Sequence, residues 1–151
     1  MTAQLFFPTA TWIPVKDGHD DARHVFDRHY SRYHYADGRK PKLFVGPGEK
    51  TVLITPCLKG LFVWRRFISA DGQQGINCAI FRNEGAGRSS DLILDAEVIA
   101  RSRWGNQRFF TYVNPKKIRS TNPGYCFLKA GWTHAGRTKK RNYLILVKEP
   151  L

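Results

Sequence analysis

The order of elements in the chain is decided by residues 76–113, which read INCAIFRNEGAGRSSDLILDAEVIARSRWGNQRFFTYV. The first part, Ile76–Phe81, has the apolar composition of a β-strand. A helix is expected from about Ser89 to Arg103, and a second strand over Arg108–Val113. A helix between two strands predicts a crossover connection, which makes the two strands parallel neighbours in one sheet.

The helix of this stretch has a start signal and a packing signal. Ser89 or Ser90 is expected to accept hydrogen bonds from the unpaired backbone N–H groups of its first turn. Apolar residues recur at the spacing of one helical face. They are Leu92, Ile93, Ala96, Ile99 and Ala100. This stripe is expected to be buried.

The chain upstream of this stretch begins irregularly and then forms a helix. Residues 1–19 are expected to be irregular or strand-like, because Pro8 and Pro14 interrupt any helix. A helix opens at Asp20 with acidic residues at its positive end. We expect it to end near Ser31–Tyr35.

The remaining expected elements are strands and one short helix. They are the strands Thr51–Thr55, Leu61–Phe67, Trp132–Gly136 and Tyr143–Val147 and the helix Gly124–Ala130. The connector after Leu61–Phe67 contains a turn signal and predicts a hairpin with Ile76–Phe81. The order predicts an α/β or α+β fold with a mixed sheet and flanking helices, in a single domain over residues 1–151.

The charge balance points to a polyanionic partner. The chain of 151 residues has 25 Lys and Arg against 12 Asp and Glu, a net charge of +13. Nucleic acid is the simplest partner for such an excess. The alternative is a basic surface without a specific partner.

Basic residues cluster in three expected turns, where they would contact DNA phosphates rather than read a base sequence. The clusters are Arg39, Lys40 and Lys42, then Lys116, Lys117 and Arg119, then Arg137, Lys139, Lys140 and Arg141. The alternative is that these turns are merely solvated.

Several classes of protein are excluded by the sequence. No apolar run approaches the roughly 18 residues of a membrane span, and the first residues lack a signal-peptide pattern. We therefore expect a cytoplasmic protein without a membrane partner.

Cys57, Cys78 and Cys126 lack disulfide or zinc spacing and are expected to be buried small apolar residues. Four histidines recur every five residues, a spacing that cannot place them on one helical face as a metal site. They are His19, His24, His29 and His34.

Residues 82–90 leave a strand and enter a helix, and they include Gly85 and Gly87. Glycines allow a close backbone approach to a ligand, and a helix N-terminus offers N–H groups and a positive dipole. The stretch is therefore a candidate cradle for a phosphate or pyrophosphate. It lacks the Gly-Lys-Ser/Thr of a Walker A loop and the third glycine of a dinucleotide fingerprint. The alternative is a glycine-rich turn set by geometry alone.

His29 and Tyr30 lie on the apolar face of the first helix with Phe26. Such a pair is either packed, hydrogen-bonded core or a base and a phenol that open onto a cleft.

The loop and its surroundings resemble the GNAT acyltransferases. Arg82-x-x-Gly85-x-Gly87 matches the R/Q-x-x-G-x-G/A loop whose backbone amides hold the acyl-CoA pyrophosphate in that family. Residues 127–132 resemble its Y-x-x-x-G-F segment, and the order of elements from about Val52 onward is also similar. The resemblance implies a GNAT-like fold and acetyl-CoA or a related acyl donor. The donor would be held by Arg82, Gly85, Gly87, Arg88, Ser89 and Ser90.

A narrower resemblance is to the Mom-type bacteriophage DNA-modification proteins, a divergent GNAT branch that alters adenine in phage DNA. Its pattern is matched by His29-Tyr30-Ser31, Arg82, Arg88-Ser89-Ser90, and Asn114 at the end of a strand. The resemblance implies a site formed by His29, Tyr30, Arg82, Ser90 and Asn114.

Two residues depart from the family pattern. Asn114 stands where the family usually has an acid, which would serve as a general base. Phe127 stands where it has a tyrosine, which protonates a leaving thiolate. Tyr125, two residues earlier, is the expected substitute.

Together the resemblances imply a phage-type transferase that acts on DNA bases, with His29 or Tyr30 accepting a proton from the attacking amine. The splayed strands around Phe81 and Tyr112 would bind the donor's arm. One alternative is a GNAT-like N-acetyltransferase for a protein or small amine. Another is a non-enzymatic phage protein that binds nucleic acid or a host factor. The sequence leaves the donor, the substrate, metal dependence and the oligomeric state open.

Overall fold

The computed structural model describes residues 11–29, 36–37, 43–46, 48–67, 72–117 and 123–151. Its helices and strands follow the order that the sequence predicts. They are β1 (Ile13–Val15), α1 (Asp20–Asp27), β2 (Glu49–Ile54), β3 (Gly60–Arg66), β4 (Ile76–Asn83), α2 (Ser89–Trp104), β5 (Phe109–Val113), the 3-10 helix η2 (Pro115–Lys117), α3 (Tyr125–Lys129), β6 (Thr133–Arg137) and β7 (Leu144–Lys148).

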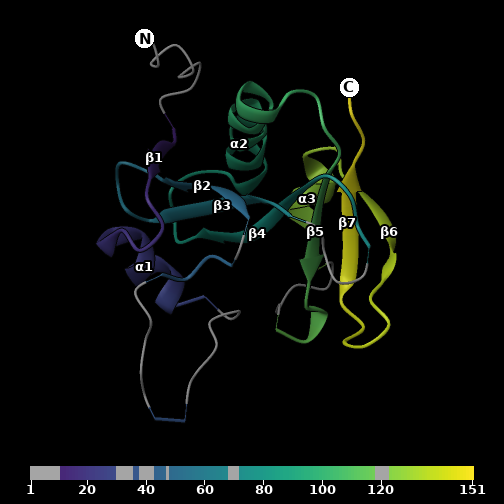
Figure 1. Ribbon diagram of the computed structural model, residues 1–151, viewed down its shortest axis with the longest axis horizontal. Coiled ribbons are helices and arrows are strands. Elements are labelled where there is room, and N and C mark those ends of the chain that lie inside the picture. The colour runs from purple at the N-terminus through teal and green to yellow at the C-terminus, as the bar shows by residue number, and fades with distance from the viewer. Residues whose placement is uncertain (1–10, 30–35, 38–42, 47, 68–71, 118–122) are drawn as a thin grey trace.

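The strands of the described residues form one seven-stranded sheet in the order β1-β2-β3-β4-β5-β7-β6 (Figure 1). All neighbours are antiparallel except β4 and β5, which are parallel and are joined by α2. The predicted mixed α/β fold, with its crossover and its hairpin between β3 and β4, is confirmed.

β4 and β5 pair only at their first residues and then separate. The pairs are Ile76 with Phe109, Asn77 with Phe110 and Cys78 with Thr111. At the last pair, Thr111 Oγ1 donates a hydrogen bond to the Cys78 carbonyl at 2.8 Å. In Figure 1, β2 and β3 run across the view while β5 and β7 run nearly vertically, so the sheet opens toward the carboxyl ends of β4 and β5.

An extra residue in β4 lies directly after the last of these pairs. Val63 of β3 is opposite Ile80, whereas the next residue, Trp64, is opposite Cys78. Ala79 is therefore a β-bulge, which bends a strand and changes the facing of the residues that follow. In a regular strand, residues three positions apart face opposite sides of the sheet. Because of the bulge, Cys78 and Phe81 instead pack in the same core, and Ile80 packs on the other side of the sheet.

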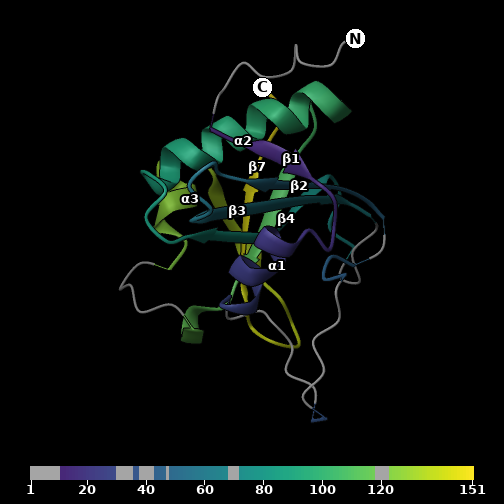
Figure 2. The same cartoon turned by 90° about the vertical axis from the view of Figure 1, so that its left-hand side faces the viewer.

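α1 and α2 lie on opposite sides of β2–β4 (Figure 2). The stripe predicted for α2 is buried at all five positions, which confirms that prediction. Two tryptophans fix the helix in place, since Trp12 and Trp64 each donate an indole N–H to an α2 backbone carbonyl at 2.9 Å. Burial of this stripe is the main stabilising contribution of α2, because apolar area removed from water is the dominant favourable energy of folding.

Glu97 also lies on the buried face of α2 and is 0 % exposed. Its carboxylate accepts hydrogen bonds from Trp132 Nε1 at 2.8 Å, Lys148 Nζ at 2.7 Å and Arg101 Nη2 at 3.0 Å. Lys148 Nζ also donates to the Ala130 carbonyl at 2.9 Å. One buried carboxylate thus ties α2 to β7 and to the residues between α3 and β6.

The prediction for the end of α1 is wrong. The helix ends at Asp27 rather than near residues 31–35, and the N–H of His29 bonds to the Phe26 carbonyl at 2.8 Å. Arg28 and His29 instead contact β4 and the loop that follows it. Because these partners are more than fifty residues away in sequence, helical periodicity gives no sign of them.

Two smaller predictions are also wrong. The N-cap of α2 is Arg88, and no side chain caps the first turn. The Ser89 hydroxyl accepts a hydrogen bond from Asn83 Nδ2 at 2.9 Å, so the preceding loop uses its oxygen. Cys57 is exposed in the turn between β2 and β3, whereas Cys78 is buried and Cys126 is partly buried.

Candidate functional site

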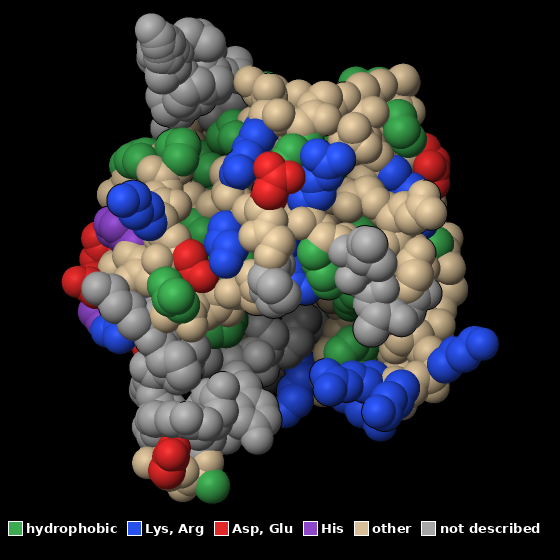
Figure 3. All heavy atoms as spheres, in the orientation of Figure 1, with side chains coloured by type: hydrophobic (Ala, Val, Ile, Leu, Met, Phe, Trp, Pro, Cys, Tyr) green, Lys and Arg blue, Asp and Glu red, His purple; other side chains and the backbone are tan. Residues whose placement is uncertain are grey.

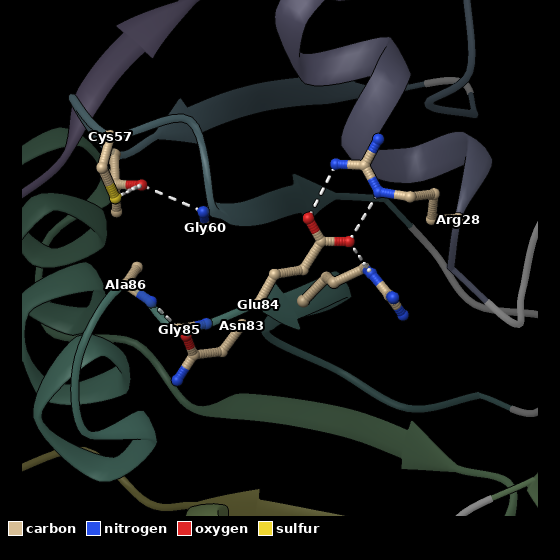
Figure 4. Close-up of polar contacts among 9 residues, drawn as sticks. Arg28, Cys57, Gly60, Asn83, Glu84, Gly85 and Ala86 are labelled. Atoms are coloured by element: carbon tan, nitrogen blue, oxygen red, sulfur yellow. Dashed lines mark hydrogen bonds and ion pairs between the residues drawn. The ribbon is translucent and has the colours of Figure 1, made fainter.

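The loop between β4 and α2 is organised by the side chain of Asn83. Its Oδ1 accepts hydrogen bonds from the N–H groups of Gly85 at 3.0 Å and Ala86 at 2.8 Å (Figure 4). Its Nδ2 donates to the Gly87 carbonyl at 2.7 Å and to Ser89 Oγ. A short polar side chain that bonds to backbone just ahead in this way holds a tight turn. Two amides of the predicted phosphate cradle therefore already have an acceptor.

The turn between β2 and β3 supports this loop from the side. Glu84 N–H donates to the Lys59 carbonyl at 2.7 Å, and the Gly60 N–H donates to Thr55 Oγ1 at 2.9 Å. A Cβ on Gly60 would lie 3.2 Å from the Cβ of Ala86 and 2.8 Å from Thr55 Cγ2. Glycine at position 60 thus allows the turn to pack closely on the loop.

Glu84 gathers two arginines at the start of the loop. Arg28 binds both of its carboxylate oxygens at 2.7 Å (Figure 4). Arg82 Nε binds one of them at 2.6 Å. The hydrogen bond from Arg28, followed by that from Arg82, lowers the pKa of Glu84 to about 2. Arg82, predicted to hold donor phosphates, is therefore engaged with a carboxylate of its own loop.

A cavity of about 520 Å³ lies between the start of α2 and α3. It is lined by Arg88, Ser89, Ser90, Tyr125, Cys126 and Lys129. The structure therefore brings the predicted Arg88, Ser89 and Ser90 together with the predicted Tyr125. The first backbone N–H groups of α2 have no side-chain cap, and the positive end of the helix dipole favours an anion there.

Tyr125 and Phe127 have different environments on α3. Tyr125 is 53 % exposed and lines the cavity. Phe127, at the position where the GNAT pattern has tyrosine, is buried and packs edge-on against Phe81 with ring centroids 5.9 Å apart. Burial raises the pKa of the neighbouring Cys126. Tyr125 therefore supplies the phenol of this cavity.

His29 makes a structural contact on the other side of the sheet. It is 8 % exposed, and its Nε2 lies 3.2 Å from the Phe81 carbonyl. Because a carbonyl can only accept, Nε2 holds the proton. Burial, and then the positive charge of Arg82, lower the pKa of His29 to about 4. A neutral ring therefore links the end of α1 to β4. Tyr30 lies outside the described residues.

Asn114 belongs to a third place in the fold. Its Oδ1 accepts a hydrogen bond from Lys116 N–H at 3.1 Å, and its carbonyl accepts one from Lys117 N–H at 3.1 Å. These bonds start η2, which stands where the sequence predicted only a polar loop. The predicted residues thus divide between the α1 side of β4, the cavity at α2, and the turn after β5.

Two of the predicted basic segments lie at one end of the sheet. Val113, the last residue of β5, is opposite Leu144, which also pairs with Arg137. The segment after β5 and the β6–β7 turn therefore emerge side by side, and Figure 3 shows Lys and Arg side chains gathered there at the lower right. This basic end consists of the exposed residues Lys116, Lys117, Arg137, Lys139, Lys140 and Arg141. Arg119 and residues 39–42 lie outside the described residues.

Sequence reasoning missed Asn83 and Lys129 as residues of the site. Asn83 lies two residues before Gly85, and asparagine in such a turn commonly bonds to backbone two or three residues ahead. That signal was available. Lys129 reaches the cavity only because α3 packs beside α2, and a sequence does not show such a juxtaposition.

Neither a scan against protein-family models nor a search of curated proteins finds a match to the chain. Among the described residues, no group of three or more His, Cys, Asp or Glu side chains could hold a metal ion. No helix that these residues form has the length and apolar character needed to cross a bilayer.

Proposed function

We propose that the chain is a GNAT-like transferase that moves an acyl-type group from a coenzyme A thioester to an amine of a DNA base. The observation that carries the proposal is the separation of β4 and β5 after three residue pairs, beside the uncapped start of α2. A parallel pair that opens next to a helix N-terminus offers an extended slot with an anion-binding end. The order of elements around the slot is the one that the resemblance to GNAT acyltransferases implies.

The donor's phosphates would bind in the cavity at the start of α2. Arg88 and Lys129 supply positive charge there, and the first-turn N–H groups of Ser89 and Ser90 supply donors. Gly85 and Ala86 do not take part, because Asn83 occupies their amides. The phosphates would therefore lie closer to the helix than the glycine pattern alone implies.

The transfer follows the usual course of acyl exchange. The amine nitrogen attacks the thioester carbonyl carbon, the new C–N bond forms, and the C–S bond breaks. In this proposal Tyr125 would give its proton to the leaving thiolate and regain one from water. The amine releases its extra proton to solvent, because His29, with a lowered pKa and its Nε2 proton directed at a carbonyl, is a poor acceptor.

DNA would bind along the basic end. Lysines and arginines on two adjacent turns can contact successive phosphates, and such contacts position a duplex without selecting a sequence. Binding should therefore weaken steeply with salt. Removing one contact, as in Lys140→Ala, should reduce the slope of log K against log salt by about 0.9. Thr133→Ser on β6, an exposed position where the change keeps every charge, should leave the slope unchanged.

Donor binding can be tested by calorimetry with acetyl-CoA. Arg88→Ala and Lys129→Ala should each weaken binding about tenfold or more, since hydrogen bonds to charged groups contribute roughly 1.5–3 kcal/mol. Arg141→Ala, an equal loss of charge at the basic end, should leave donor binding unchanged. Tyr125→Phe should bind the donor normally and lose transfer. A wild-type chain that binds no coenzyme A contradicts the proposal.

The product can be tested by mass spectrometry of nucleosides from DNA co-expressed with the chain. A base with an added mass that disappears in Tyr125→Phe supports the proposal. Unmodified DNA in cells that contain the folded wild-type protein contradicts it.

Two observations favour a second candidate, a nucleic-acid-binding protein of this fold without transferase activity. The loop amides are already bonded to Asn83, and Phe127 occupies the position of the family's tyrosine. This candidate predicts salt-dependent DNA binding together with no binding of acetyl-CoA, which separates it from the transferase in the same two assays.

A further inference from the structure

A second cavity lies on the face of the sheet opposite α2, at the point where β4 and β5 separate. Its volume is about 230 Å³, and it is lined by Arg65, Phe67, Asn77, Cys78, Ala79 and Tyr112. Binding sites for drug-sized molecules have roughly 300–1,000 Å³. The cavity is therefore suited to a single small group rather than to an entire cofactor.

Arg65 lines this cavity, and its guanidinium has close neighbours at the end of β3 and at Gly46. Its guanidinium carbon lies 3.4 Å from the centroid of the Phe67 ring, a stacked arrangement that arginine favours on aromatic faces. Gly46 packs against the guanidinium, since a Cβ at that position would overlap it. Two neighbours thus fix its orientation.

The charge of Arg65 has no carboxylate partner among the described residues. Its Nε is buried and makes no hydrogen bond, and burial lowers its pKa. A desolvated donor without an acceptor is costly in a resting protein. In the described part of the chain, Arg65 contrasts with Arg28, Arg82 and Arg101, each of which binds a glutamate.

Asn77 places a hydrogen-bond acceptor beside this donor. Arg65 and Asn77 are directly opposite residues of β3 and β4, so their side chains leave the same face of the sheet as neighbours. The Asn77 amide nitrogen donates to the carbonyls of Cys78 and Phe110, both at 3.3 Å. The amide oxygen of Asn77 therefore remains available to accept a hydrogen bond from a ligand.

A bare anion fits this pair poorly. A phosphate or carboxylate would satisfy Arg65 but would bring negative oxygens against the oxygen of Asn77. A group with an acceptor and an N–H donor side by side satisfies both residues, and the hydrogen-bonding edge of a nucleobase has this pattern. Flat rings also stack favourably on aromatic side chains and on guanidinium planes.

We propose that this cavity binds one nucleobase, unstacked from the DNA, with Arg65 donating to the base and Asn77 accepting from it. This inference rests on the proposed function and identifies where that function would hold its substrate. The cavity and the donor site lie on opposite faces of the sheet, on either side of the point where β4 and β5 separate. An exocyclic amine held here would face a thioester in the slot. Enzymes that modify a base commonly take it out of the stack.

The test compares the affinities of one chain for three kinds of DNA duplex with the same flanking sequence. One duplex is fully paired, one has an extra unpaired nucleotide with each of the four bases in turn, and one has an extra abasic nucleotide. Fluorescence anisotropy at fixed salt gives the Kd of each. The wild-type chain should bind at least one unpaired base about tenfold more tightly than the abasic duplex, since stacking of one base contributes roughly 1–3 kcal/mol.

Three variants assign that preference to the cavity. Arg65→Gln should abolish it, and Arg66→Gln, an equal loss of charge on the next residue of the strand, should retain it. Gly46→Ala should also abolish it, because the new Cβ displaces the guanidinium without changing the net charge. All three should bind the fully paired duplex within about threefold of one another, an expected spread of less than 1 kcal/mol.

Equal wild-type binding to every unpaired base and to the abasic duplex overturns this inference and leaves the proposed function standing. Retention of the preference in Arg65→Gln overturns it as well. Failure of the wild-type chain to bind any duplex overturns the proposed function and the base site together. The wild-type comparison needs no variant and decides the question even if a substitution impairs folding.

Discussion

Glu84 and Glu97 each hold two cations, but in different surroundings. Glu84 lies at the surface of the loop after β4, where its side chain is 19 % exposed and binds Arg28 and Arg82. Glu97 is fully enclosed by α2, β7 and Trp132, and it binds Arg101 and Lys148. The same set of charges therefore orders a loop in one place and joins secondary-structure elements in the other.

The difference shows that burial, rather than the number of ion pairs, decides what a carboxylate contributes. An exposed pair gains little, because water and salt already stabilise its charges. In a buried cluster, loss of the carboxylate leaves cations that have no anion and little water. We therefore expect substitutions at the two glutamates to have very different consequences for stability. Four predictions, at these glutamates and at His29 and Asn83 beside Glu84, test the comparison in order of expected effect.

The largest effect is expected for Glu97→Gln. It keeps the size of the side chain but leaves Lys148 and Arg101 beside a neutral amide, which should lower the free energy of unfolding by about 3–5 kcal/mol. Denaturation by urea measures this. Glu149→Gln is the matched control, since Glu149 is exposed and meets Arg108 at 3.4 Å, and its effect should stay below about 1 kcal/mol. Similar losses in both variants would remove the distinction between the two carboxylates.

The next effect is a pH dependence due to His29, which neighbours the Glu84 cluster. Its pKa in the folded protein is about 4, against 6.5 ordinarily. Between these values only the unfolded chain takes up the proton, so stability should fall by about 3 kcal/mol as the pH drops from 6.5 to 4. His29→Gln should flatten this part of the stability profile, whereas His134→Gln on exposed β6 should not. An unchanged slope in His29→Gln would show that the ring titrates normally.

A smaller effect is expected for Asn83→Ala. The substitution removes four hydrogen bonds within the loop and should cost about 1–2 kcal/mol, because water replaces part of the loss at this surface. Hydrogen exchange is the sharper measurement, since the amides of Gly85 and Ala86 should exchange faster while those in the centre of α2 do not change. Unchanged exchange of the Gly85 and Ala86 amides in Asn83→Ala would contradict the role given to Asn83.

The smallest effect is expected for Glu84→Gln, about 1 kcal/mol at neutral pH, which is less than its pKa shift alone would give because water and salt screen charges at this surface. The pKa of Glu84 is about 2 in the fold against an ordinary 4.5. Its contribution is therefore present above pH 4.5 and is lost as the pH falls toward 2, and the variant should lack this part of the acid transition. Comparison of Glu84→Gln with Arg28→Gln and with the variant that carries both substitutions measures the contribution of the Glu84–Arg28 ion pair to stability. A loss as large as that of Glu97→Gln would contradict the comparison.

Much of the fold could be predicted from sequence because its elements carry local signals. The five-residue stripe of α2 and the short β-rich runs of β2–β5 locate these elements close to their observed bounds. The parallel pair follows from the helix between β4 and β5. The end of α1 and the bulge at Ala79 depend on long-range contacts instead, and local patterns do not contain them.

The residues of the two cavities likewise differ in how far local sequence signals predict them. Arg88, Ser89 and Ser90 were predicted because glycines before a helix form a recognisable pattern, and Tyr125 because it lies near an expected tyrosine; these four residues line one cavity. Glu97 carried a signal that was overlooked, namely a charge between Ala96 and Ala100 on an otherwise apolar face. Arg65 and Asn77 lie on the two strands of the predicted hairpin, but the register of β3 with β4, which places them opposite each other, could not be predicted from the sequence.

The two outer strands of the sheet also bear on how copies of the chain meet. β1 contains Pro14, which lacks an N–H group, and proline at such a position interrupts further strand addition. β6 is exposed along its whole length, and its pairing with β7 shifts register between His134 and Arg137. Short edge strands with a proline or an irregular register discourage edge-to-edge aggregation. High concentrations of the protein should therefore remain free of strand-mediated assembly, even though β1 and β6 each pair on one side only among the described residues.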